Sequence, residues 1–144
     1  MCNMNYLTVI ICLFFTGCTT ITNVSNSEVF ISEIGKKELI KKAFICEVEN
    51  TALPRKELPK NVIYQNHGFE ECPRGKHIAS LDKGFILDIT EISYRLHFGL
   101  FFTEHWFMVG KMNIDGENMD FYYRIGITTT GHPPIAYKED LLWK

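Results

Sequence analysis

The chain has 144 residues, of which 22% are charged, and its formal net charge is −2. This length supports one hydrophobic core and excludes a second independent one. Because acidic and basic residues are interspersed, no strongly basic face is expected, and a nucleic-acid partner is excluded.

The first distinctive segment is the apolar run over residues 7–15, which is followed by Thr16, Gly17 and Cys18. The run is too short for a permanent membrane-spanning helix and is typical of an export signal. The segment Phe15-Thr16-Gly17-Cys18 resembles the signal of bacterial lipoproteins, which ends in a small-residue box before a cysteine that receives lipid. The resemblance implies cleavage before Cys18, lipidation of Cys18 and attachment to the membrane through this N-terminal lipid.

Two features depart from the lipoprotein pattern. Phe15 stands where leucine is usual, and residues 1–6 contain no Lys or Arg. An ordinary secretory signal cut elsewhere and an uncleaved anchor are therefore the alternatives. Thr19 follows the cysteine where an aspartate would resemble the inner-membrane retention signal, so we expect an outer-membrane protein that faces the periplasm.

The sequence predicts three segments. Residues 1–17 form the signal peptide, residues 18–27 form the lipidated cysteine with a polar, flexible tether, and residues 28–144 form a single β-rich domain. Cys46 and Cys72 are the two thiols left in that domain. In an oxidising compartment they predict one disulfide, with two separate buried thiols as the alternative.

The first half of the domain predicts a short helix and then strands. Ser32 can cap a helix that includes Leu39 and Ile40, although Gly35 weakens this pattern. Alternation over residues 44–49 predicts a strand, and residues 62–64 predict a brief second one. The proline-marked segment 53–59 predicts the connection between these strands.

The second half predicts longer strands. In residues 83–92, Phe85, Leu87 and Ile89 fall on one face of a half-buried strand. Residues 106–114 and 118–125 flank Asp115-Gly116, a pair that favours a tight hairpin turn. A last short element is expected to end at Trp143.

These elements predict a mainly β fold with one short N-terminal helix, either a small antiparallel barrel or a curved sheet. Residues 81–84, with the strand and aromatic hairpin that follow, resemble the opening of bacterial Src-homology-3-like domains. The resemblance implies a barrel of that type. An α+β sheet with one helix is the alternative.

No pattern of catalytic or metal-binding residues occurs among the five histidines or elsewhere. We therefore expect a protein that is not an enzyme and has no cofactor and no metal. If the domain were a small hydrolase with an unrecognised site, then His97, His105 and Glu104 would be the first residues to test.

The densest unusual feature is an aromatic stretch over residues 96–107. It has too many rings for simple alternation between core and solvent, so some are candidates for partner binding, with core filling as the alternative. The candidate partner-binding residues are Phe101, Phe102, Trp106, Tyr122 and Tyr123.

Two classes of function follow. The first is a lipid-anchored, non-enzymatic module that binds a protein partner in the cell envelope, such as an assembly accessory, an inhibitor or an immunity-type protein. The second is a small periplasmic hydrolase or ligand-binding carrier. The first is preferred because the chain has an anchor signal and a compact β domain without a catalytic motif.

Overall fold

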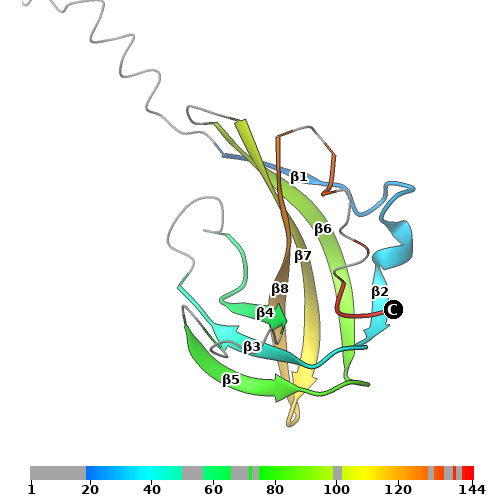
Figure 1. Ribbon diagram of the computed structural model, residues 1–144, viewed down its shortest axis with the longest axis vertical. Helices are drawn as coiled ribbons and strands as arrows, with labels where there is room; N and C mark the ends of the chain where they lie inside the picture. The colour runs from blue at the N-terminus through cyan, green and yellow to red at the C-terminus, as the bar shows by residue number, and fades with distance from the viewer. Residues whose placement is uncertain are drawn as a thin grey trace, which may run out of the picture.

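The structure is a computed structural model that describes residues 19–49, 57–65, 72, 75–98, 102–129, 132–134, 138 and 141–144. This part of the chain is mainly β, and its strands form one curved sheet (Figure 1). The strands are β1 (Thr19–Asn23), β2 (Gly35–Glu38), β3 (Ala43–Glu47), β4 (Asn61–Gln65), β5 (Lys76–Leu81), β6 (Ile86–Phe98), β7 (Phe102–Ile114) and β8 (Glu117–Thr128).

The strand order is β1-β6-β7-β8-β4-β3-β5, and β2 also pairs with β6. Within the described residues β1 and β5 end this path without pairing with each other, so the sheet is open. Of the two predicted arrangements, the curved sheet is present. The antiparallel prediction is wrong for β4 and β8, which run parallel at Asn61↔Phe121 and Val62↔Tyr122. No hairpin turn joins these two strands, so nothing local imposes an antiparallel direction.

The predicted hairpin is confirmed and is longer than expected. β7 and β8 pair from Ile114↔Glu117 at the turn to Glu104↔Thr128 at the far end. Asp115 and Gly116 have φ angles of 52° and 89°, which are the positive values that a tight two-residue turn requires. β6 continues the meander on the other side of β7, so three long strands form the centre of the sheet.

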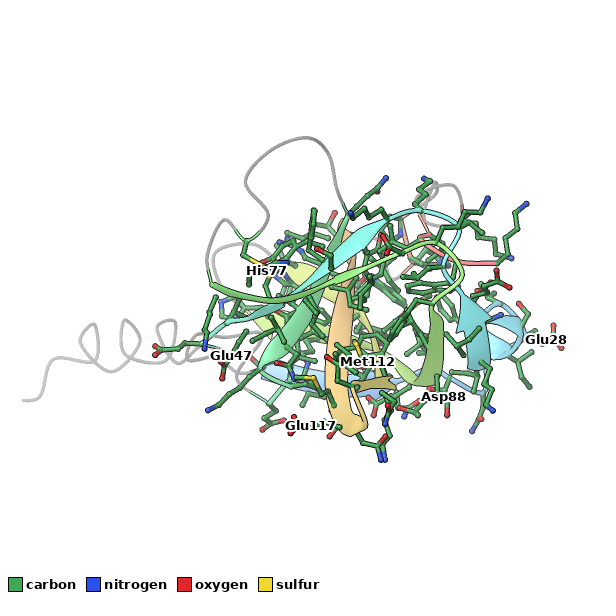
Figure 2. All side chains as sticks on the ribbon, turned by 90° about the horizontal axis from the view of Figure 1, so that it is seen from below. Glu28, Glu47, His77, Asp88, Met112 and Glu117 are labelled. Atoms are coloured by element: carbon green, nitrogen blue, oxygen red, sulfur yellow. A yellow bond between two sulfur atoms is a disulfide. The ribbon has the colours of Figure 1, made fainter. Side chains whose placement is uncertain are left out.

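Both faces of the central strands are buried. Trp106, Met108 and Phe121 belong to the main core, whereas Phe107 and Tyr122 belong to a second cluster on the opposite face. Figure 2 places Met112 within the fold and Glu28, Glu47 and Glu117 at its periphery. Burial on both faces explains why aromatic side chains occupy successive positions, since neither face of these strands needs to be polar.

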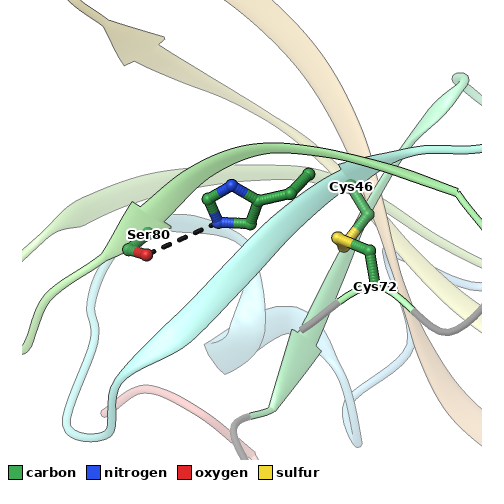
Figure 3. The surroundings of a disulfide bond; sticks show 4 residues. Cys46, Cys72 and Ser80 are labelled. Atoms are coloured by element: carbon green, nitrogen blue, oxygen red, sulfur yellow. Dashed lines mark hydrogen bonds between the residues drawn. A yellow bond between two sulfur atoms is a disulfide. The ribbon is translucent and has the colours of Figure 1, made fainter. Parts of the chain in front are cut away.

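The disulfide joins Cys46 of β3 to Cys72, as the cysteine count predicts, with a Cα–Cα distance of 5.8 Å (Figure 3). Cys46 is fully buried and lies in the second cluster with Phe44 and Val62. On the neighbouring strand β5, Ser80 Oγ lies 3.5 Å from His77 Nε2, the contact that the dashed line marks in Figure 3. The disulfide therefore attaches Cys72, which packs against the second cluster, to β3 of the sheet.

The predicted N-terminal helix is wrong. Ile31–Glu33 form a single 3-10 turn, η1, and the next residues form strand β2 against β6. Gly35 has a φ of 101°, a value that a right-handed helix cannot contain. Leu39 and Ile40, which the sequence pattern assigns to the helix, instead follow β2 in the chain, and Leu39, fully buried, pairs with Trp143 in an isolated bridge.

The first described residues lie in the range predicted as a tether. Thr19–Asn23 form β1, which pairs with β6 from Thr19↔His97 to Asn23↔Ser93. Beyond β1, Val24 N donates to Ile92 O at 2.9 Å, which continues the attachment to β6. Polar residues in this segment therefore belong to the edge of the sheet.

Candidate functional site

The structure separates the predicted partner-binding aromatics by exposure. Phe102 is 61% exposed, whereas Trp106 and Tyr122 are 2% and 1% exposed. Tyr123 is half-buried, and its ring centroid lies 5.1 Å from that of Trp143. Phe101 lies outside the described residues, as does Cys18. Among the described candidates, Phe102 has the ring that a partner can reach without rearrangement of the core.

Trp106 is part of a network that joins β7 to the end of β8. Its Nε1 donates a hydrogen bond to Thr128 Oγ1 at 2.9 Å. The same hydroxyl lies 3.0 Å from Glu104 Oε2 and 2.9 Å from the carbonyl oxygen of His132, and its one proton can be given to only one of them. The Trp106 ring also packs against Tyr94, with centroids 4.8 Å apart. Trp106 therefore serves the core in this structure.

The structure divides the residues considered for a hydrolase between the two faces of the sheet. Register places His105 opposite Arg95 and His97 opposite Thr103, so both imidazoles lie on one face of the sheet. Glu104 lies on the other face, where its carboxylate meets Thr128. No group of three potential metal ligands occurs in the described part of the chain.

A polar row on β6 was not predicted. Ser93, Arg95 and His97 share one face of β6, and Thr19 lies opposite His97 on β1. Their atoms Ser93 Oγ, Arg95 Nε, His97 Nδ1 and Thr19 Oγ1 are buried and have no hydrogen-bond partner in the part of the chain that the structure describes. In the sequence this row is marked by polar residues at alternate positions over 93–97. Such a pattern is typical of a strand face that is exposed to solvent.

Arg95 is the charged member of this row. The residue is 6% exposed, and its Nη1 lies 3.7 Å from Glu57 Oε2, a carboxylate that is largely exposed. Burial lowers the pKa of the guanidinium, and the nearby Glu57 and Glu91 act in the opposite direction. Glu57 is far from Arg95 in the sequence, so this contact on the face of β6 is a tertiary one.

A groove of about 800 Å³ lies near the β7–β8 turn, between residues 57–61 and 117–120. Because β4 meets β8 only at Phe121 and Tyr122, residues 117–120 have no strand neighbour on this side within the described ranges. Asn61 Nδ2 donates to Asp120 O at 2.9 Å across the inner end of the groove. An unpaired strand edge of this kind can accept an extended segment of another chain.

Apolar side chains are exposed at the opposite end of the sheet. Phe102 begins β7, and Ile127, 47% exposed, is the penultimate residue of β8. Ile21 of β1, 41% exposed, lies in the same cross-strand row as Ile127, through Arg95 and His105. We call the region of Thr19, His97, Phe102 and Ile127 the Thr19 end of the sheet; it is the upper end in Figure 1.

Comparison with protein-family models, with curated proteins and with solved structures gives no match. Among the described residues there is no helix with the length and apolar character needed to span a membrane.

Proposed function

We propose that the protein is a lipoprotein of the cell envelope, anchored through Cys18, that acts as a non-enzymatic protein-interaction module. The observation that carries the proposal is the apolar run over residues 7–15 followed by Phe15-Thr16-Gly17-Cys18. Thr19 after the cysteine favours the outer membrane, with the domain facing the periplasm. The Cys46–Cys72 disulfide supports an oxidising compartment, because disulfides are rare in the reducing cytosol.

For the partner we favour an envelope protein that contributes an extended segment to the groove beside residues 117–120. The groove offers an unpaired strand edge with Lys60 and Lys111 on its walls beside Glu117 and Asp120. Backbone pairing gives affinity in such a site, and the charged side chains give specificity. The role would be that of an assembly accessory, an inhibitor or an immunity-type protein. A relationship to Src-homology-3-like domains belongs to this proposal as well.

The lipid anchor is tested by metabolic labelling with a fatty-acid analogue in a bacterium that processes lipoproteins. Wild-type protein should be labelled, and Cys18→Ala should lose the label and leave the membrane fraction. Cys12→Ala is the matched control, because it removes a thiol from the signal and should leave labelling unchanged. Persistent labelling of Cys18→Ala would remove the proposal.

The partner site is tested by photo-crosslinking in cells. A photoreactive residue at Asn118, in the groove, should give a discrete crosslinked protein band, and one at Lys36, exposed on β2, should not. The same pattern of bands from both positions would contradict a partner site in the groove.

A ligand carrier is the second candidate, and the buried row on β6 is the observation that favours it. Arg95, with Ser93 and His97 beside it, could hold an anionic group. Native mass spectrometry of the purified protein would detect a retained small molecule. Its loss in Arg95→Gln would support the carrier, and a protein that never retains a ligand would oppose it.

A further inference from the structure

The anchor and the sheet are adjacent in the chain. Thr19 is the first residue of β1 and pairs with His97 of β6. Consecutive Cα atoms are about 3.8 Å apart, so no tether residue separates Cys18 from the sheet. The following segment is also attached, since Ile92 N donates to Ser25 Oγ at 2.9 Å. A lipid on Cys18 would therefore hold the Thr19 end of the sheet beside the bilayer.

The side chains at this end suit an apolar neighbour. Phe102 is 61% exposed, Ile127 is 47% exposed and Ile21 is 41% exposed. Apolar and aromatic side chains of peripheral proteins commonly sit at the boundary between headgroups and acyl chains. The opposite end of the sheet carries the exposed Asp115 and Glu117 at the β7–β8 turn, which anionic headgroups would repel.

We infer that the Thr19 end of the sheet rests on the phospholipid bilayer, with Phe102 and Ile127 in contact with lipid. The inference depends on the proposed lipidation of Cys18. Once the anchor is inserted, contact by these side chains is an intramolecular event, so a small apolar area suffices to fix the orientation. The long strands then stand away from the membrane and present the groove beside residues 117–120 to the periplasm.

This orientation assigns Phe102 to the membrane and leaves the protein partner to the rest of the surface. It also predicts a contrast between the two ends of the sheet. Ile86, at the start of β6, is 51% exposed and pairs with Glu38. It is 11 residues from His97 along β6, a span of up to about 36 Å at about 3.3 Å per residue. Ile86 is therefore the matched position that lipid should not reach.

The test uses the full chain, expressed and processed in a lipoprotein-processing bacterium and reconstituted into vesicles. The vesicles contain phosphatidylethanolamine and phosphatidylglycerol with brominated acyl chains, which quench nearby tryptophan fluorescence. The variants are Phe102→Trp, Ile127→Trp and Ile86→Trp. The native Trp106 and Trp143 are buried, 2% and 3% exposed, and the unsubstituted protein gives their background.

We expect the added tryptophan in Phe102→Trp and Ile127→Trp to be quenched at least about twofold more than that in Ile86→Trp. Mass spectrometry of the N-terminal peptide of the same samples reports whether Cys18 carries lipid. If lipid is present and neither variant is quenched more than Ile86→Trp, the orientation is wrong while the anchor stands. If lipid is absent, both the proposed anchor and the orientation are wrong.

Discussion

Trp106 Nε1 donates a 2.9 Å hydrogen bond to the hydroxyl of Thr128, the last residue of β8, and so connects the core of the sheet to its Thr19 end. Trp143 is buried to a similar extent, but its Nε1 has no hydrogen-bond partner within the described part of the chain. The two buried indoles thus differ in whether Nε1 donates a hydrogen bond, and substitution of each tryptophan can isolate this difference.

Trp106→Phe should destabilise the domain by about 1 kcal/mol more than Trp143→Phe. Both changes replace a buried indole with a smaller ring. Only Trp106→Phe also removes a hydrogen bond and leaves the Thr128 hydroxyl without its donor. Urea unfolding of the two variants and the wild type measures the difference. Equal losses would mean that the Trp106–Thr128 bond contributes nothing to stability.

Reduction of the Cys46–Cys72 disulfide should lower the free energy of unfolding by about 3.5 kcal/mol in the chain-entropy model. The two cysteines are 26 residues apart in the sequence, so the disulfide restricts a sizeable loop in the unfolded chain. Urea unfolding with and without a thiol reductant measures the effect. The double variant Cys46→Ala, Cys72→Ala is the control, and a reductant effect of the same size on it would show that the disulfide is not the cause.

The local features of the fold could be predicted from sequence. Asp115-Gly116 marks the hairpin because few residue pairs adopt two positive φ angles, and Leu87 and Ile89 mark the buried face of β6 by their spacing. β1 and β5 could not be found in this way. β1 is mostly polar, and only its pairing with β6, 70 to 78 residues later in the chain, makes it a strand.

The candidate site was predictable only in part for the same reason. The aromatic stretch marked Phe102 and Trp106 alike, because composition does not reveal whether a second layer covers a strand. On one face of the sheet the ring of Phe30 packs against Trp106, and on the other the carboxylate of Glu57 meets Arg95. These contacts come from distant parts of the chain, which a local pattern cannot show.

Gly110→Ala should destabilise the domain by about 1–3 kcal/mol because it overfills a packed position. A Cβ at residue 110 would meet the Asp88 carbonyl oxygen of β6 and would lie 2.8 Å from Phe121 Cζ. Gly116→Ala is the comparison, since the Cβ there meets nothing within 4 Å and the cost arises from its φ of 89° alone. Thermal unfolding of both variants separates the two causes. Asparagine tolerates positive φ, so Gly116→Asn should be less destabilised than Gly116→Ala. At residue 110 the order should be reversed, with Gly110→Asn less stable than Gly110→Ala.

Arg95→Met should leave the free energy of unfolding unchanged or raise it by about 1 kcal/mol. Burial lowers the pKa of Arg95, so folding disfavours the charged form of the side chain. The folded state therefore binds fewer protons than the unfolded state only in strongly alkaline solution. Only there does the free energy of unfolding rise with pH. Near neutral pH the guanidinium is charged in both states, and the penalty is constant.

Methionine keeps the apolar contacts of Arg95 and removes its charge. The guanidinium's loss leaves only the largely exposed Glu57 carboxylate without its ion-pair partner. Arg124→Met, on an exposed position of β8, is the matched control and should change stability by less than about 0.5 kcal/mol. Glu57→Gln should destabilise the domain by less than about 1 kcal/mol, and less again at high salt, because the ion pair is partly screened. Urea unfolding at neutral pH measures all three. If Arg95→Met instead cost more than about 2 kcal/mol, the guanidinium would make a stabilising contact, and the row on β6 would be structural and unsuited to hold a ligand.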